Sequence, residues 1–500
     1  MPKRPNILFC ISDDQSWPHA SAYGCKWVNT PAFDRIACEG ILFNNAFTPN
    51  AKCAPSRAAI LTGRYSWQLQ EACNHLCFFP SEYITFQEIF GEAGYATGFT
   101  GKGWGPGEPR TYSDGSSRQL VGPEINELKL KPPATGINSI NYSANFETFL
   151  NAKPDDTPFC FWYGGKEPHR GYEYGSGVRL GGKSLDDIDE VPPCWPPTDD
   201  VKNDMLDYAF EVEWFDKHLG EILDILEKNN ELENTLIMVT SDNGMPFPRM
   251  KGQLYEVAYH MPLAAMWKGV IEPGRTIDDL INFVDFAPTF LEAAGIDAHP
   301  QMTGESLMPI FQSAESGLVD ESRTALISGK ERHDICRPDT AGYPIRGIRD
   351  HQHLYLRNFE PDRWPAGDPE IYYRNIDDSP TKTRVVEEKE QGNETYWQLC
   401  MGKNPEEELY NIQTDPHCIN NLADSPEHQD IKNTLWTNLQ ATLKQHGDPR
   451  MEGRGHIFDD YPVTNSDKEK EILERLRIAK ETGIFCKENN PKAGSQKSAD

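Results

Sequence analysis

The stretch Asn6-Ile7-Leu8-Phe9-Cys10-Ile11 is a continuous apolar run, and it leads directly into Ser12-Asp13-Asp14. A short apolar run of this kind is typical of a strand that is buried on both faces of a parallel sheet. The carboxyl ends of such strands form the edge at which open α/β folds bind their ligands. We therefore predict an α/β fold with Asp13 and Asp14 at this edge, although an Asp pair can also cap a following helix.

The same pattern recurs far along the chain. Thr235-Leu236-Ile237-Met238-Val239-Thr240 is a second apolar run, and it ends in Ser241-Asp242-Asn243-Gly244. If the two strands are neighbours, hard oxygen ligands meet at one point: Asp13, Asp14, Asp242 and the Asn243 carbonyl. Such a set selects Ca²⁺ or Mg²⁺ over zinc.

Two further predicted strands carry polar residues to the same edge. The apolar run at 158–163 is followed by Lys166 and His169, and a strand at 95–100 leads into Lys102. A lone histidine or lysine in a loop is usually only solvated. The position of these residues at strand ends favours a role in the site.

The segment from Asn50 to Arg64 contains a cysteine at the predicted start of a helix. Pro55 suits the first turn because it has no N–H and its φ is already helical, so Cys53 is expected at the helix N-terminus. Free N–H groups make that position an anion site and lower a thiol pKa. Arg57, one turn along, adds planar donors that suit a tetrahedral oxyanion. The alternative is a surface helix with a buried cysteine and a solvated arginine.

This segment resembles a known signature. Cys53, Pro55, Ser56 and Arg57, followed by Leu61-Thr62-Gly63-Arg64, are similar to the motif of the type I sulfatases, in which the cysteine is oxidised to formylglycine. The resemblance implies that the four oxygen ligands hold one divalent cation, with the oxygen of residue 53 completing the set. Calcium is preferred over magnesium on this resemblance.

The resemblance also implies the architecture, an alkaline-phosphatase-like fold. Such a fold has a large, mostly parallel sheet between helices and a smaller C-terminal α+β subdomain on a short antiparallel sheet. From Tyr343 the sequence changes to short alternating strands. We therefore predict a catalytic domain at 1–342, a C-terminal subdomain at 343–488 and a flexible tail at 489–500.

Roles for individual residues follow from the same resemblance. Lys102 and Lys251 would grip the sulfate from two sides, and His169 would assist the leaving group. Trp104 and Lys166 stand where the family commonly has histidines. Their presence raises the alternatives of a sugar-stacking ring at Trp104 and of a site with fewer polar contacts.

Substrate-binding residues are predicted around this site. Trp104 and Lys166 are two of them. Lys330, Arg332 and His333 follow a predicted strand at 325–328 and are expected near the same rim. A solvated charge cluster is an equal alternative for these three residues.

Composition limits the classes of partner. The chain has 49 Lys and Arg against 77 Asp and Glu, for a net charge of −28. Such a chain has no general attraction for nucleic acid or an anionic membrane, and no apolar run is long enough to span a bilayer. The N-terminus lacks the apolar region of a signal peptide. We therefore expect a cytoplasmic protein as the chain stands, or a periplasmic or secreted one if a leader was removed.

The cysteines predict few disulfides. Twelve in this length are too sparse for a disulfide scaffold. Cys10, Cys38 and Cys160 lie in apolar surroundings and are predicted as core thiols. Cys73 and Cys77 are predicted to form a structural turn, with a local disulfide as one option.

The segments 240–248 and 167–170 look most like the sulfamidase (heparan N-sulfatase) branch. This resemblance implies a sulfatase that acts on sulfated polysaccharides or oligosaccharides. A formylglycine-generating or sulfatase-maturating enzyme would be its partner during biosynthesis. Two alternatives remain open. One is a phosphatase or phosphonate monoester hydrolase of the same fold, and the other is a sulfated-glycan-binding protein with impaired catalysis.

Overall fold

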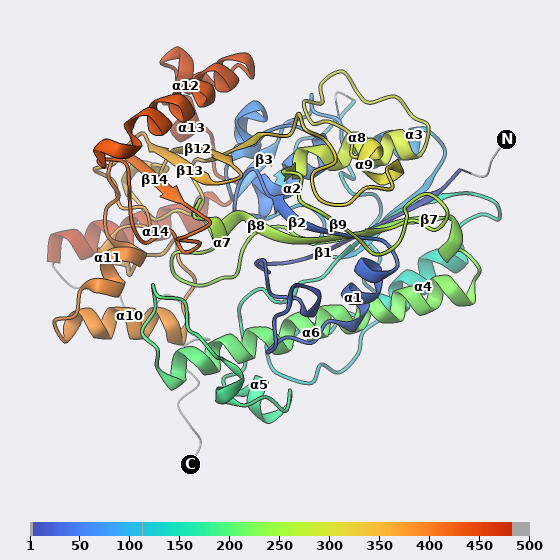
Figure 1. Cartoon of the computed structure of the whole chain (residues 1–500), viewed down its shortest axis with the longest axis horizontal. Coiled ribbons are helices and arrows are strands. Elements are labelled where there is room, and N and C mark those ends of the chain that lie inside the picture. The colour runs from blue at the N-terminus through green and yellow to red at the C-terminus, as the bar shows by residue number, and fades with distance from the viewer. Residues whose placement is uncertain (1–3, 113, 483–500) are drawn as a thin grey trace.

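The dominant element is a large sheet. A computed structural model describes residues 4–112 and 114–482, and within them eight strands form a sheet with the order β10-β2-β8-β7-β1-β6-β4, in which β9 pairs with β2 (Figure 1). All pairings are parallel except those of β8 with β2 and β7. The strands are β1 (Asn6–Ser12), β2 (Ile41–Phe47), β4 (Ala96–Gly101), β6 (Phe159–Gly164), β7 (Thr235–Ser241), β8 (His260–Met266), β9 (Arg275–Ile277) and β10 (Ile281–Asn282). This is the mostly parallel sheet that the sequence predicts.

Strands β1 and β7, which carry the predicted metal ligands at their carboxyl ends, are neighbours in the sheet. Strand β1 pairs in parallel with β6 on one side and with β7 on the other, and Ser12 lies opposite Ser241. Because β1 and β7 end in register, Asp13 and Asp242 leave the sheet side by side. The prediction that these two strands are neighbours is confirmed.

The side chains of β1 alternate between two hydrophobic cores. Ile7, Phe9 and Ile11 belong to one core, and Leu8 and Cys10 belong to the other. All five are fully buried. A strand that packs on both faces explains why the run has no polar residue in alternate positions.

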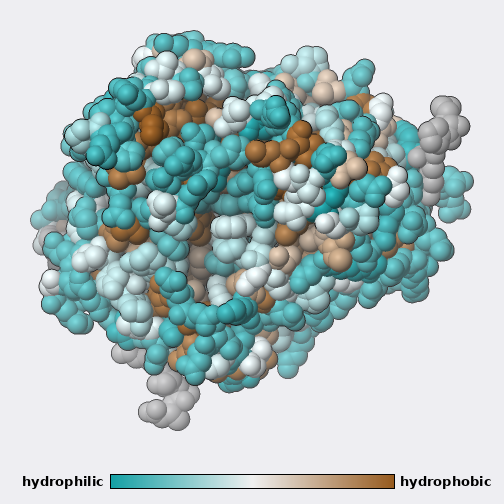
Figure 2. All heavy atoms as spheres, in the orientation of Figure 1, coloured by the Kyte–Doolittle hydropathy of each residue, from teal (hydrophilic) through white to brown (hydrophobic). Residues whose placement is uncertain are grey.

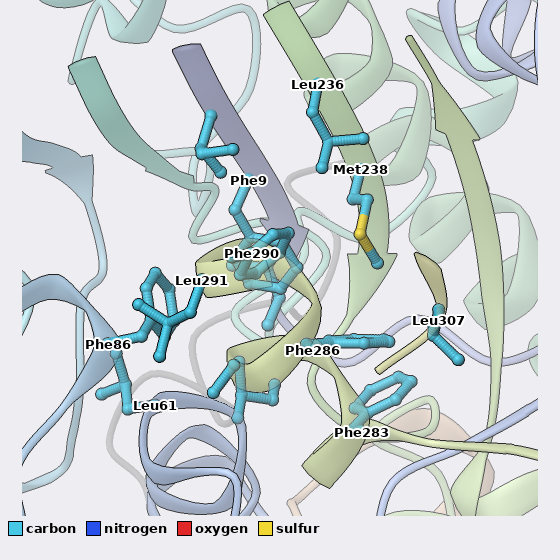
Figure 3. Close-up of a cluster of buried hydrophobic side chains, with 14 of the residues drawn as sticks. Phe9, Leu61, Phe86, Leu236, Met238, Phe283, Phe286, Phe290, Leu291 and Leu307 are labelled. Atoms are coloured by element: carbon cyan, nitrogen blue, oxygen red, sulfur yellow. The ribbon is translucent and has the colours of Figure 1, made fainter. Parts of the chain in front are cut away.

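Helices cover both faces of the sheet (Figure 1). On one face lie α2 (Cys53–Thr62), α3 (Phe86–Glu92), α8 (Phe286–Ala293) and α9 (Met308–Gln312); on the other lie α1 (Pro31–Cys38), α4 (Tyr142–Ala152) and the long α6 (Asp199–Lys228). Figure 3 shows Phe286 and Phe290 of α8 packed beneath Phe9 of β1. The sheet is therefore sandwiched, as expected.

A second sheet lies at the carboxyl edge of the first. It is antiparallel and consists of β11 (Ala325–Lys330), β12 (Ile345–Asp350), β13 (His353–Asn358) and β14 (Glu407–Asn411), with α12 (Gln429–Gln445) packed on it. In Figure 1 these elements are yellow-orange to red and lie opposite the N-terminus. The predicted antiparallel subdomain is confirmed. Its first strand precedes residue 343, so the boundary there stays a prediction, and the tail 489–500 lies outside the described residues.

An insertion between β13 and β14 reaches back to the main sheet. Its helices α10 (Pro380–Glu390) and α11 (Thr395–Met401) pack with α6 and with the long connection at 171–198 in a third core. The remaining strands and α-helices are the short β3 (Cys77–Phe79), β5 (Gly107–Pro109), α5 (Ser176–Arg179), α7 (Glu256–Tyr259) and α13 (Ile457–Asp460), and the longer α14 (Ser466–Thr482). The insertion thus packs against the helix layer that covers one face of the main sheet.

The surface and the cysteines complete the fold. Figure 2 shows a mostly hydrophilic face with small, separate hydrophobic patches. Among the described helices, none has the length and apolarity that crossing a membrane requires. Cys10 and Cys160 are buried as predicted, but the prediction for Cys38 is wrong, because it ends α1 and is exposed there. Cys73 and Cys77 are buried free thiols, so the optional disulfide is absent between them.

Replacing Phe9 with Ala is expected to lower the free energy of unfolding by about 3–5 kcal/mol. The ring is fully buried and contacts Trp162, Phe286 and Phe290, with ring centroids 4.8, 5.9 and 5.5 Å away. Denaturant unfolding followed by fluorescence measures the change. Leu318→Ala, at a residue that is 57% exposed, is the control, and an equal loss in both variants would contradict the packing described here.

Candidate active site

The start of helix α2 lies against the ends of β1. The helix begins at Cys53, as the sequence predicts, and all ten of its residues are buried. Cys53 Sγ is 3.4 Å from Asp13 Oδ1 and 3.9 Å from Asp14 Oδ1. Residue 53 therefore faces the acidic residues directly.

A backbone turn lets two consecutive carboxylates face the same point. In an extended strand, neighbouring side chains point to opposite faces. Asp14 has a φ of 79°, which ends this alternation just past β1, and its N–H donates to Asp242 Oδ1 at 3.1 Å. As a result, ligand atoms of Asp13, Asp14, Asp242 and Cys53 all lie within 4.8 Å of one another.

Three cations neutralise the three carboxylates. Lys102 Nζ, which follows β4, lies 2.7 Å from both oxygens of Asp13. Lys251 Nζ, in the loop after β7, lies 2.6 Å from Asp14 Oδ2, and Arg57 Nε of α2 lies 2.7 Å from Asp242 Oδ2. Since all of these carboxylates are buried, such pairing is required to keep them charged.

Arg57 is mainly a positioning residue in this arrangement. Its Nη1 donates to the carbonyls of Lys102 and Gly103 at 2.8 and 2.9 Å. Its Nη2 has no hydrogen-bond partner among the described residues and lies 3.7 Å from Asp13 Oδ1. One donor group is thus left for the oxyanion contact that the sequence predicts, and that contact stays a prediction.

Burial dominates the titration of the site. It raises the pKa of the Cys53 thiol, although Lys102 opposes this. The prediction that the helix N-terminus lowers this pKa is therefore wrong, because the loss of solvent outweighs the favourable charges. Burial also raises the pKa of Asp242 to about 6 against the pull of Arg57. Burial would also raise the pKa of Asp13, but nearby positive charges, mainly that of Lys102, outweigh it. The pKa of Asp13 therefore lies well below its usual range.

The residues present fit a hard divalent cation. Asn243 is fully buried, and its Nδ2 donates to Asp14 Oδ1 at 2.7 Å. Its Oδ1 has no hydrogen-bond partner within residues 4–112 and 114–482. An orphaned amide oxygen beside three carboxylates is a donor set that suits Ca²⁺ or Mg²⁺, so the structure provides a buried acidic cluster able to hold a metal ion.

His169 lies on the open side of the cluster. Its loop follows β6, its Nδ1 is 3.1 Å from the Arg170 carbonyl, and its Nε2 is 3.9 Å from Asp14 Oδ2. The side chain is partly exposed. If Nδ1 donates to the carbonyl, Nε2 is directed at the site and can exchange a proton with a bound molecule.

The two residues in place of the expected histidines differ in their surroundings. Trp104 Nε1 donates to the Ala54 carbonyl at 3.0 Å, and the ring contacts Phe79 edge-on. Trp104 therefore supports the first turn of α2. Lys166 is partly exposed in the loop that carries His169. Their predicted substrate contacts stay predictions.

The predicted rim residues after β11 are buried. Lys330 Nζ lies 3.3 Å from Gln253 Oε1, and His333 Nε2 lies 2.9 Å from Asn50 Oδ1. Arg332 donates to the carbonyls of Tyr461 and Pro462 at 2.8 and 3.3 Å. These contacts tie the three side chains to neighbouring segments of the protein, and their predicted role in substrate binding stays a prediction.

The sequence interpretation missed four charged or titratable residues near the site. Lys52 Nζ is 2.7 Å from Asp334 Oδ2, His75 Nδ1 is 3.1 Å from Asp334 Oδ1, and Asp377 Oδ2 is 3.5 Å from Lys251 Nζ. They come from four separate segments of the chain and belong to no recognisable motif. The only available signals are the positions of Lys52 next to Cys53 and of Asp334 next to the predicted rim.

Comparison with known proteins identifies the family. The sulfatase family profile matches residues 5–296, more than half of the chain. The chain belongs to the sulfatase family. It is 29% identical over 486 residues to an ulvan-active sulfatase of Formosa agariphila, covering 90% of this chain and 76% of that protein. It is 26% identical over 500 residues to the N-sulphoglucosamine sulphohydrolase of Homo sapiens, covering 89% and 91%.

A solved structure supports the same architecture. A protein described in complex with its substrate D-glucosamine-2-N,6-O-disulfate superposes on this sulfatase with a TM-score of 0.65 at 23% identity, covering 89% of this chain and 99% of that chain. This likeness, together with the observed sheets, confirms the predicted fold of a large, mostly parallel sheet between helices with a smaller antiparallel sheet.

Calcium is expected to raise the melting temperature of this sulfatase. A ligand at about 100 times its Kd stabilises the native state by about 2.7 kcal/mol. Asp13→Asn removes one of the buried carboxylates and should reduce the shift strongly, as thermal unfolding with and without Ca²⁺ will show. Asp189→Asn, at an exposed residue, is the matched control. An undiminished shift in Asp13→Asn would place the cation elsewhere.

Proposed function

We propose that this sulfatase removes sulfate groups from a sulfated carbohydrate, with Cys53 converted to formylglycine and one divalent cation, Ca²⁺ before Mg²⁺, as cofactor. The main support is that residue 53 faces three buried carboxylates and two lysines at the carboxyl edge of the sheet. The relatives add to this support, since they include a sulphoglucosamine sulphohydrolase and an ulvan-active sulfatase.

The proposed chemistry assigns separate roles. The cation, held by Asp13, Asp14, Asp242 and Asn243, would supply positive charge beside the sulfate. Hydrated formylglycine would supply the attacking hydroxyl, which the buried Cys53 thiol with its raised pKa cannot do.

The side chains around residue 53 act on the sulfate and on the leaving group. The ammonium groups of Lys102 and Lys251, with Nη2 of Arg57, stabilise the charge that develops on the sulfuryl oxygens. His169 Nε2 donates a proton to the departing oxygen or nitrogen.

The maturation partner is part of the same proposal. Cys53 is 1% exposed, so an enzyme that oxidises it could not reach the thiol in the folded protein. We therefore expect a formylglycine-generating or sulfatase-maturating enzyme to act before folding is complete.

The alternative functions have less support. A doubly charged phosphate favours a second metal, whereas the part of the chain that the structure describes contains a single group of three or more His, Cys, Asp or Glu ligands close enough to share an ion. A binding protein without catalysis would have no need for Cys53 and Arg57 in this arrangement.

Cys53→Ala is expected to reduce release of free sulfate by roughly 10³-fold or more, because it removes the precursor of the nucleophile. The protein is co-produced with a formylglycine-generating enzyme, and mass spectrometry confirms the modification. Sulfate is then measured with N- and O-sulfated heparin disaccharides, carrageenan oligosaccharides and 4-nitrophenyl sulfate. Cys38→Ala, at an exposed cysteine, is the control. Residual turnover equal to that of Cys38→Ala would refute the proposal.

Lys251→Ala is expected to lower kcat/KM by about 10²–10³-fold, in the range seen when one stabilising donor is removed. Its Nζ is buried beside Asp14, so the substitution removes a positive charge from the site. Steady-state kinetics measures the change, with Lys26→Ala at an exposed pair as control. A change in kcat/KM below threefold would exclude Lys251 from the sulfate site.

A further inference from the structure

A charged cluster adjoins the sulfate site and is unused by the proposed chemistry. We call it the outer cluster, and it consists of Lys52, His75, Asp334 and Asp377. Lys52 Nζ and His75 Nδ1 each contact one oxygen of Asp334, at 2.7 and 3.1 Å. Asp377 Oδ2 lies 3.5 Å from Lys251 Nζ, which is itself 2.6 Å from Asp14. The cluster is therefore one residue removed from the reacting centre.

Its acidic members are the outermost ones. The side chains of Lys52 and Lys251 are each 4% exposed, whereas those of Asp334 and Asp377 are 21% and 31% exposed. The carboxylates are thus more accessible to a molecule from solvent than the lysines are.

Both carboxylates are held in the charged form. Burial opposes ionisation of Asp377, but Lys251, Lys52 and His169 outweigh it and lower its pKa. Lys52 and His75 likewise outweigh burial at Asp334 and hold its pKa well below the usual range. Neither carboxylate can therefore donate a hydrogen bond, and each is an acceptor.

The cluster also has unused hydrogen-bonding capacity. Asp377 has one ion pair, at 3.5 Å, and its carboxylate accepts no hydrogen bond from the residues that the structure describes. His75 Nε2 is buried and has no hydrogen-bond partner within the same residues, and the same holds for Nδ1 of His333, which precedes Asp334 but is not part of the cluster. His333 is 1% exposed. Buried polar atoms without partners are rare and call for a ligand or water.

We propose that Asp334 and Asp377 determine substrate specificity by accepting hydrogen bonds from free hydroxyl groups of the sugar that carries the scissile sulfate. The substrate class is then a sugar unit with one sulfate at the reacting position and unmodified hydroxyls on the neighbouring carbons. This inference rests on the proposed function and narrows it.

The same carboxylates exclude other sugars. A second sulfate or a carboxylate on a neighbouring carbon would face Asp334 or Asp377 and would be repelled, because both groups carry negative charge. The lysines that could attract such a group are buried and are already paired. Preference for the monosulfated sugar follows from both effects.

The test compares three substrates in the matured enzyme. They are the monosulfated sugar from which the wild type releases sulfate, the same sugar with a second sulfate on a neighbouring carbon, and 4-nitrophenyl sulfate, which has no sugar hydroxyls. We expect the wild type to prefer the monosulfated sugar over the disulfated one by at least tenfold in kcat/KM.

Asp334→Asn and Asp377→Asn are expected to reduce this preference to below threefold. On the monosulfated sugar, kcat/KM should fall tenfold or more, mainly through KM, and the loss on 4-nitrophenyl sulfate should be at least tenfold smaller. Asp362→Asn, at an exposed residue of the same insertion, is the control. Melting temperatures verify folding. Asp377 accepts no hydrogen bond from described residues, so Asp377→Asn is expected to fold normally. It therefore tests the proposal even if Asp334→Asn fails to fold.

Three results would overturn the inference. One is equal or faster turnover of the disulfated sugar by the wild type. The second is an equal loss on all substrates in both variants, which would mean that the carboxylates only position Lys251 and Lys52. The third is an absence of sulfate release from every substrate, including 4-nitrophenyl sulfate, which would refute the proposed function itself and this inference with it.

Discussion

Three carboxylates buried side by side are the constraint on which the rest of the site depends. Asp13, Asp14 and Asp242 lie at the ends of β1 and β7 and are almost completely removed from solvent. Burying charges of one sign is costly unless each finds a partner. The partners Lys102, Lys251 and Arg57 come from three other segments. The site is therefore stable only when the sheet, helix α2 and two loops are all in place.

The same balance of charge prepares the site for an anion. Lys102 and Lys251 hold carboxylate oxygens that a divalent cation would also bind. We expect a bound cation to leave their ammonium groups available to a sulfate group. Arg57 instead keeps its bonds to Asp242 and to two carbonyls, so it can hold α2 and the Lys102 loop in position throughout the reaction.

Strand patterns predicted more of this molecule than local side-chain chemistry did. The apolar runs that end in Asp13 and Asp242 were enough to predict neighbouring strands, because a parallel sheet brings strand ends to one edge. The helix start at Cys53 followed from Pro55. The pKa of Cys53 was mispredicted because the helix dipole can be read from sequence, whereas burial of the whole first turn depends on the tertiary structure. Cys38 was mispredicted for the same reason.

The outer cluster could not be predicted from the sequence, for a different reason. Lys52, His75, Asp334 and Asp377 are brought together by the second sheet and by the insertion before β14, and no local pattern records that contact. The backbone turn at Asp14, with its φ of 79°, could not be predicted either, because no glycine stands at that position. Both features arise from tertiary packing, so only a structure shows them.

The central claim is that the ends of β1 and β7 form a cation site against a modified residue 53. A high-resolution crystal structure of protein matured with a formylglycine-generating enzyme and grown with Ca²⁺ tests it most directly, because anomalous scattering locates the ion. The account predicts one cation in contact with oxygens of Asp13, Asp14, Asp242 and Asn243, and formylglycine at position 53. Carboxylates bridged only by Lys102 and Lys251 in such crystals, with the cation bound elsewhere or absent, would contradict it.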